Sequence, residues 1–183
     1  MTATTLDPKT ALILVDLQKG IVGHPTVHPA EEVVERAARL AAAFREHDLP
    51  VVLVRVTGGA PGRNEGSGRQ GTPPADWAEL VPELNRQDSD IVVTKQTWGA
   101  FYGTDLDMQL RRRGITQVVV GGIATAIGVE STARGAHERG YHVTIATDAI
   151  TDLDAETHRN SVERVFPRLG ETDTTEAIVK LLG

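Results

Sequence analysis

The sequence predicts a three-layer α/β/α fold built on a central, mostly parallel sheet. Short runs rich in β-branched residues alternate along the chain with longer amphipathic stretches, which is the pattern of strands joined by crossover helices. The strand runs are almost continuously apolar, as expected where helices cover both faces of a parallel sheet. A length of 183 residues suits one domain, which we expect to span residues 1–183.

Six strands are expected in this sheet. Five follow from the clearest apolar runs, at Ala11–Asp16, Val51–Val56, Ile91–Thr94, Gln117–Gly121 and His142–Thr147. A sixth, shorter strand is expected near Arg168–Thr172, directly after Pro167.

The amphipathic stretches between these runs predict the helices that cover the sheet. In Pro29–His47, apolar residues recur at three- and four-residue spacing and form one helical face. Thr104–Arg113 begins with a capping hydroxyl and two acids and ends with three arginines, which complements the helix dipole before Gly114 ends the helix. Further helices are expected at Gly128–Arg139, at Ala155–Val165 behind the cap Asp154, and at Thr175–Leu182 behind the cap Thr174.

One long segment, Gly58–Pro74, lies outside this pattern. It is rich in glycine and proline and has almost no apolar residues, so it cannot contribute to the core. Two interpretations stay open: a mobile lid or subunit contact, and a disordered surface insertion.

Composition excludes several classes of function. The formal net charge of -6 leaves no basic excess for a nucleic-acid partner. The chain has no cysteine, which excludes disulfides, thiolate metal sites and a cysteine nucleophile. No signal-peptide pattern precedes the first strand, and the apolar runs are far shorter than the roughly 20 residues of a membrane-spanning helix. We expect a cytoplasmic protein with no membrane partner.

Polar residues at the ends of the expected strands are the first candidates for a site, because parallel sheets bind ligands beyond the carboxyl ends of their strands. Asp16 ends the first strand, Lys95 ends the third, and the turn Gly121–Gly128 follows the fourth. The lysine would keep the carboxylate ionised, whereas burial would raise its pKa. The sequence leaves open which effect prevails, and each residue alone is also typical of a cap or a surface ion pair.

Four further residues are expected to bind a substrate. Trp98 and Phe101 come shortly after Lys95 and are expected to line the pocket, although core packing and packing between subunits stay open. Gln18 lies two residues after Asp16 and is expected on the same side, and Arg55 near the end of the second strand is expected to pair with an acidic substrate.

No metal or cofactor is expected. His24 and His28 have a spacing that would suit a metal on a helix, but the neighbouring prolines predict a loop there.

Five segments, in order and spacing, carry a resemblance to a known family: LILVDLQKG, VVLVRV, KQTWGAFYGTDLDMQLRRRGI, VVVGGIATAIGVESTARGAHERGY and TDAI. Nearly the whole chain resembles the isochorismatase-like hydrolase superfamily, which includes isochorismatase, nicotinamidase and N-carbamoylsarcosine amidase. The resemblance implies a Rossmann-like sheet with strand order 3-2-1-4-5-6, a small-molecule substrate and assembly as a homo-oligomer, either a dimer or a tetramer.

The resemblance also implies roles for Asp16 and Lys95. In the cysteine hydrolases, a strand-one Asp, a Lys and a Cys form the catalytic triad, and their motif reads like ATDICVESTA where this chain has ATAIGVESTA. The third position therefore falls on Gly128, which has no side chain to form a thioester. Isochorismatases proper also have glycine there and hydrolyse a vinyl ether. Asp16 would then be the general acid with a raised pKa, and Lys95 would orient it and bind the substrate carboxylate.

The turn after the fourth strand departs from isochorismatase, where GVYAHVG supplies an aromatic residue and a histidine. Ala124 and Thr125 stand in those places, so a differently shaped pocket with Thr125 in its wall is expected. Family members commonly have a cis peptide at the position of Ile123–Ala124, which would direct the backbone N–H groups of Ala124 and Gly128 into the pocket as an oxyanion site. A hydroxyl nucleophile in this turn would need an adjacent base, and no histidine is close in sequence.

We therefore expect a cofactor-independent hydrolase that acts on a small carboxylated substrate by Asp16 and Lys95 acid–base chemistry, with vinyl ether hydrolysis and pyruvate release as the preferred reaction. Two alternatives stay open: a non-catalytic homologue that binds a small metabolite, and amide hydrolysis by a water molecule that Asp16 activates.

Overall fold

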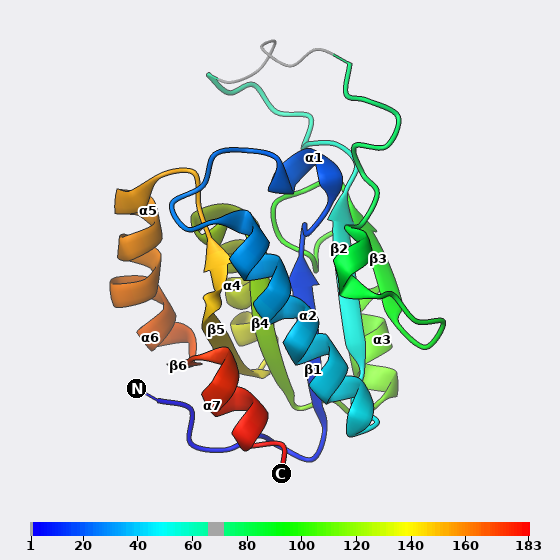
Figure 1. Cartoon of the computed structure of the whole chain (residues 1–183), viewed down its shortest axis with the longest axis vertical. Helices are drawn as coiled ribbons and strands as arrows, with labels where there is room; N and C mark the ends of the chain where they lie inside the picture. Colours follow the sequence, from blue (N-terminus) through cyan, green and yellow to red (C-terminus); the bar gives the residue numbers. More distant parts are fainter. Residues whose placement is uncertain (1, 66–71) are drawn as a thin grey trace.

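The computed structural model describes residues 2–65 and 72–183. Its centre is a six-stranded sheet in the order β3-β2-β1-β4-β5-β6, and every pair of neighbouring strands is parallel (Figure 1). This confirms the predicted fold class and order. The strands are β1 (Thr10–Val15), β2 (Val51–Val56), β3 (Ile91–Lys95), β4 (Gln117–Ile123), β5 (His142–Thr151) and β6 (Glu171–Asp173).

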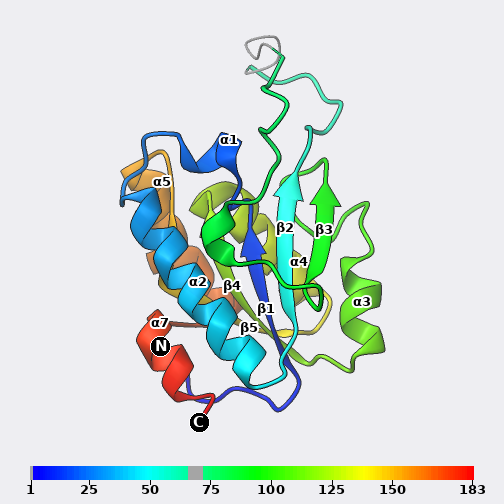
Figure 2. The same ribbon diagram turned by 45° about the vertical axis from the view of Figure 1, so that its right-hand side comes forward.

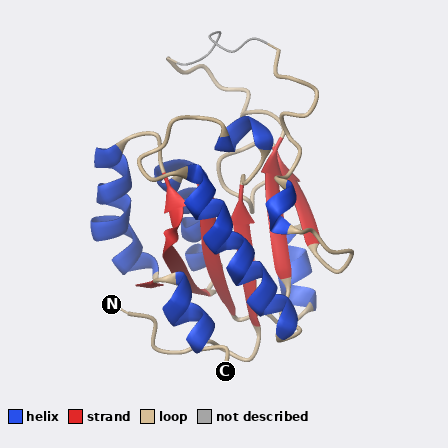
Figure 3. Ribbon diagram, viewed as in Figure 1, coloured by secondary structure: helices blue, strands red, loops and turns tan. Residues whose placement is uncertain are grey.

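Helices cover both faces of the sheet (Figures 2 and 3). One face packs against α2 (Ala30–Glu46), α7 (Thr175–Lys180) and the 3₁₀ turn η1 (Pro82–Leu84). The other packs against α3 (Leu106–Arg112), α4 (Glu130–Glu138) and α6 (Phe166–Leu169). Because successive strand residues point to opposite faces, the same strands supply both apolar cores. Among the helices of the described part of the chain, none combines the length and apolar character that a bilayer span requires.

Several element boundaries differ from the prediction. The helix expected to begin at Gly128 starts earlier, with a π-helical turn η2 (Thr125–Val129) that leads into α4. The helix expected over Ala155–Val165 consists of α5 (Ala155–Asn160) and the π-helical turn η3 (Ser161–Val165), and it continues into α6. The short helix α1 (Lys19–Val22) and η1 were not predicted, since single turns leave no periodic pattern in a sequence.

Two of the helix caps predicted from the sequence form the expected hydrogen bond between the side chain and the backbone. Asp154 accepts a hydrogen bond from the Thr157 backbone N–H, and Thr174 accepts one from Ala177 N–H, as predicted for helix caps. Gly114 has a φ of +67° just beyond α3, which is the left-handed conformation expected of a residue that ends a helix.

The segment predicted as a loop outside the core has no helix or strand where it is described. Residues 58–65 and 72–74 are exposed, and residues 66–71 lie outside the described part of the chain. The chain returns from this loop at Trp77, whose indole ring occupies the space that a side chain at position 20 would need. Gly20 therefore lets Trp77 pack directly onto α1, next to the end of β1.

Gly122 is expected to be essential for the packing of β4 on β1. Its φ is +122°, and a Cβ there would overlap the backbone nitrogen and carbonyl oxygen of Val15. Replacing Gly122 with alanine should lower the free energy of unfolding by about 2–6 kcal/mol, from backbone strain and overpacking together. Gly103 also has a positive φ but has open space around it, so Gly103→Ala should cost only about 1–2 kcal/mol. Denaturant unfolding of both variants measures the difference, and equal losses would contradict the close packing at Gly122.

Candidate functional site

Asp16 and Lys95 meet beyond the carboxyl ends of the strands. Asp16 follows β1 with a φ of +54°, a left-handed conformation that aspartate tolerates better than most residues, and it ends the strand there. Lys95 is the last residue of β3. Although β2 lies between these strands, Lys95 Nζ is 2.7 Å from Asp16 Oδ2. The pair is buried, with Asp16 6% and Lys95 2% exposed.

Burial controls the proton affinity of Asp16. It raises the pKa of this carboxyl to about 6, and the neighbouring ammonium of Lys95 opposes the rise only in part. Desolvation therefore prevails, which the sequence had left open. Oδ2 accepts the hydrogen bond from Lys95, whereas Oδ1 is buried and has no hydrogen-bond partner among the described residues. A proton on Oδ1, or a hydrogen bond that a substrate donates to it, would offset the free-energy cost of burying this oxygen without a partner.

Lys95 is held in place by a second acceptor. Its Nζ also donates to the backbone carbonyl oxygen of Thr97, at 3.0 Å. Asp16 and Thr97 use two of its three N–H donors, and the third is left for a ligand group as far as the described residues show. Sequence reasoning missed Thr97, because a backbone acceptor has no residue signature.

Gly128 lies directly beside the carboxylate. A Cβ at this position would be 3.1 Å from Asp16 Oδ2 and 2.9 Å from Val15 Cγ1, so a side chain there would require Val15 or the carboxylate to shift. The Ile123–Ala124 peptide is cis, which confirms the conformation that the resemblance implied. The carbonyl of Ala124 accepts hydrogen bonds from Ile127 and Val129 N–H and thereby starts the turn η2.

Two buried side chains, those of Asp152 and Thr132, anchor this turn. Asp152, just after β5, accepts a hydrogen bond from Ala126 N–H at 2.6 Å. Thr132 donates to the Gly128 carbonyl at 2.7 Å and accepts from Ala100 N–H at 3.1 Å, which ties η2 to the loop after β3. The sequence did not reveal these two contacts, because Asp152 is 26 residues from Ala126 and Thr132 is 32 residues from Ala100.

Thr125 has a partner that the sequence could not show. Its Oγ1 lies 2.8 Å from Nδ1 of His158 on α5, and the rings of His158 and His28 contact edge to face. Burial lowers the pKa of His158, and the nearby His28 lowers it further, against an opposing effect of Asp152. A histidine does therefore stand beside a hydroxyl of this turn. However, Thr125 has no exposed surface, so its hydroxyl is enclosed rather than open to a substrate.

Gln18 and Arg55 are both hydrogen-bonded within the protein. The Gln18 amide donates to the carbonyl oxygens of Val56 and Trp77 and accepts from Val56 N–H, which fastens the return of the long loop to the sheet. Arg55 pairs in register with Thr94 and bonds its hydroxyl, so it lies on the opposite face of the sheet from Lys95.

The two expected aromatic pocket residues have different surroundings. Phe101 is 6% exposed and packs in the core, where its ring stacks on Tyr141 at 6.1 Å and lies close to Gly135. Trp98 is 66% exposed, in the same loop. The structure thus places the Phe101 ring in the core, and of these two aromatic rings only that of Trp98 is largely exposed to the surroundings.

No group of three or more His, Asp or Glu side chains has a metal-binding arrangement within residues 2–65 and 72–183.

Comparisons with known proteins show the family and the fold of this chain. The isochorismatase domain family matches residues 10–177. The chain is 48% identical to the isochorismatase family protein YwoC of Bacillus subtilis, over 94% of this chain and 93% of that protein. It is 31% identical to the ureidoacrylate amidohydrolase RutB of Methylobacterium radiotolerans, over 97% of this chain and 81% of that protein. A solved structure of an isochorismatase family protein from Burkholderia thailandensis is 41% identical, with a TM-score of 0.90 and 97% of both chains covered.

Proposed function

Because this chain belongs to the isochorismatase family of hydrolases, we propose that its Asp16–Lys95 site hydrolyses a vinyl ether of a small carboxylated substrate and releases pyruvate. The observation that carries the proposal is the buried Oδ1 of Asp16, which has no hydrogen-bond partner among the described residues and belongs to a carboxyl whose pKa is raised to about 6. A general acid near neutral pH needs such a group.

In the proposed reaction, Asp16 transfers its proton from Oδ1 to the methylene carbon of the enol ether. Water then adds to the resulting oxocarbenium carbon and returns a proton to Asp16. The hemiketal breaks into pyruvate and the alcohol, so the net change is the consumption of one water molecule. Lys95 holds Oδ2 and offers its third N–H to the substrate carboxylate. No covalent intermediate is needed, which is consistent with the absence of a side chain at Gly128.

The direct test is pyruvate release from isochorismate by the purified protein, read by coupling to lactate dehydrogenase. Release well above the uncatalysed background supports the proposal. Background-level release from isochorismate and from a panel of other carboxylated vinyl ethers would overturn it.

The pH dependence gives a second test with a defined sign. Asp16 must be protonated to act as an acid, so kcat/KM should be constant below about pH 6 and fall about tenfold per pH unit above it. The same raised pKa makes the folded state bind more protons than the unfolded chain between the two pKa values. The contribution of Asp16 to the free energy of unfolding should therefore fall as pH rises from about 4 to 6. A rate that increases through pH 6 would contradict the acid role.

A second candidate is amide hydrolysis, favoured by the similarity to a relative named as an amidohydrolase. Here Asp16 would act as a base and accept a proton from water through Oδ1. The rate would then rise to a plateau above about pH 6, the reverse of the acid mechanism, and ammonia or an amine would be released in place of pyruvate.

A further inference from the structure

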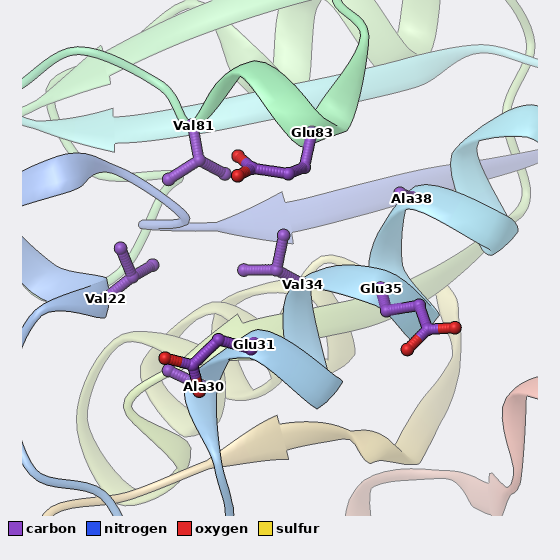
Figure 4. Close-up of a pocket in the computed structure, with 8 residues that line it drawn as sticks. All are labelled: Val22, Ala30, Glu31, Val34, Glu35, Ala38, Val81 and Glu83. Atoms are coloured by element: carbon purple, nitrogen blue, oxygen red, sulfur yellow. The ribbon is translucent and has the colours of Figure 1, made fainter.

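A groove lies between α2 and η1, with a cavity volume of about 480 Å³ (Figure 4). Its floor is apolar and comes from three segments of the chain: Val22, Ala30, Val34, Ala38 and Val81. Val34 points from α2 toward the segment that carries Val81. This volume falls within the range of small-molecule sites, which is about 300–1,000 Å³.

Three carboxylates border this apolar floor. Glu31 and Glu35 are one turn apart on α2, and Glu83 comes from η1. All three are exposed, and none forms an ion pair with any described residue. By contrast, Glu32 on the same helix pairs with Arg36. The groove therefore combines an apolar surface with negative charge that the protein itself does not neutralise.

The groove is separate from the Asp16–Lys95 site. Val34 and Val81 belong to the core between α2 and the sheet. Lys95 follows Val93 by two residues, so its side chain lies on the same face as Val93, whose core is the one on the other side of the sheet. A ligand in the groove is thus not an extension of the substrate at Asp16.

We propose that the groove binds a small organic cation, in which an ammonium or guanidinium group is attached to an apolar body. The apolar body would cover Val34, Ala38 and Val81 and remove their exposed surface from water. The cationic group would lie among Glu31, Glu35 and Glu83, where the charges are complementary. The net charge of -6 favours the approach of a cation.

Three probes of similar size and different charge test this proposal: 4-phenylbutylammonium, 4-phenylbutanol and 4-phenylbutyrate, with dissociation constants from isothermal titration calorimetry at low salt. We expect the cation to bind about tenfold more tightly than the alcohol, and the anion to bind most weakly. Added salt should reduce the advantage of the cation, because the carboxylates are exposed. Equal affinity of the cation and the alcohol would overturn the proposal.

Substitutions at the groove residues test whether the probes bind in the groove. The triple variant Glu31→Gln, Glu35→Gln, Glu83→Gln should abolish the tenfold preference for the cation. The matched control Glu46→Gln, Glu138→Gln, Glu163→Gln removes the same charge from exposed positions elsewhere and should preserve it. Ala38→Phe, which fills the half-buried floor and keeps the carboxylates, should abolish binding of both the cation and the alcohol.

Two results would contradict the proposal at this stage. One is an equal loss of preference in the control triple variant, which would mean non-specific attraction by net charge. The other is dissociation of an oligomer by Ala38→Phe in gel filtration, which would identify the groove as a contact between copies of the chain. Neither result depends on the reaction at Asp16, since Asp16→Asn should leave the affinity for 4-phenylbutylammonium unchanged.

Discussion

Replacing Asp16 with asparagine is expected to lower kcat/KM for vinyl ether hydrolysis by about 10²–10⁴-fold, the contribution typical of a general acid. The amide keeps the size of the carboxyl, and its oxygen can still accept the hydrogen bond from Lys95 Nζ. What it loses is the proton that Oδ1 would carry into the reaction. The measurement is pyruvate release under steady-state conditions, across a pH range from 5 to 8 chosen around the pKa of about 6.

The control is Asp88→Asn, which makes the same chemical change at an exposed position and should keep the parent rate. The break in the pH profile near 6 should be present in Asp88→Asn. An Asp16→Asn variant that folds and still retains both the parent rate and that break would refute the acid role of Asp16, since the titrating group would have to be another residue.

Adding a side chain at position 128 is expected to lower the same activity by about 10²-fold, whether the residue is alanine or cysteine. The new Cβ would lie 3.1 Å from Asp16 Oδ2 and 2.9 Å from Val15 Cγ1, so Val15, the carboxylate or both would have to shift. A displacement of about 1 Å in a catalytic group is enough for a loss of this size. Since the damage comes from the Cβ, the thiol of Gly128→Cys should not restore the rate.

The matched control is Gly135→Ala in α4, where a Cβ would be 3.0 Å from a ring carbon of Phe101 and where the nearest atoms belong to Phe101 and Arg139, not to Asp16 or Lys95. It should affect stability more than turnover. Wild-type turnover in Gly128→Ala would contradict the view that glycine is required beside Asp16, and a cysteine variant that is faster than the alanine variant would show that the thiol itself contributes.

The sequence predicted where Asp16 and Lys95 lie, because their placement follows from strand ends. Asp16 and Lys95 each stand where an apolar run stops, and parallel strands bring all such ends to one edge of the sheet. The sequence did not decide whether the lysine or burial controls the pKa of Asp16. That outcome depends on how deeply the pair is enclosed, and enclosure is a property of the whole fold.

The positions of the other candidates depend on register and on contacts between distant segments. Arg55 pairs with Thr94 rather than with Lys95, and this single step of register puts it on the other face of the sheet. Phe101 comes six residues after Lys95, yet its loop turns the ring into the core against Tyr141. The contact between Thr125 and His158 could not be predicted from the sequence, because the two residues are 33 positions apart in the chain.

Local sequence patterns were enough to predict the sheet, the helices that cover it and the placement of Asp16 and Lys95 at strand ends, because apolar periodicity and strand ends are local properties of the chain. Tertiary packing, in contrast, leaves Asp16 Oδ1 without a hydrogen-bond partner among the described residues and brings Val15 and Asp16 so close to Gly128 that a side chain there would require one of them to shift. Tertiary packing also places the groove between α2 and η1 on the face of the sheet opposite the Lys95 side chain. Those features arise where segments far apart in sequence pack against one another, and burial there sets both proton affinity and available space.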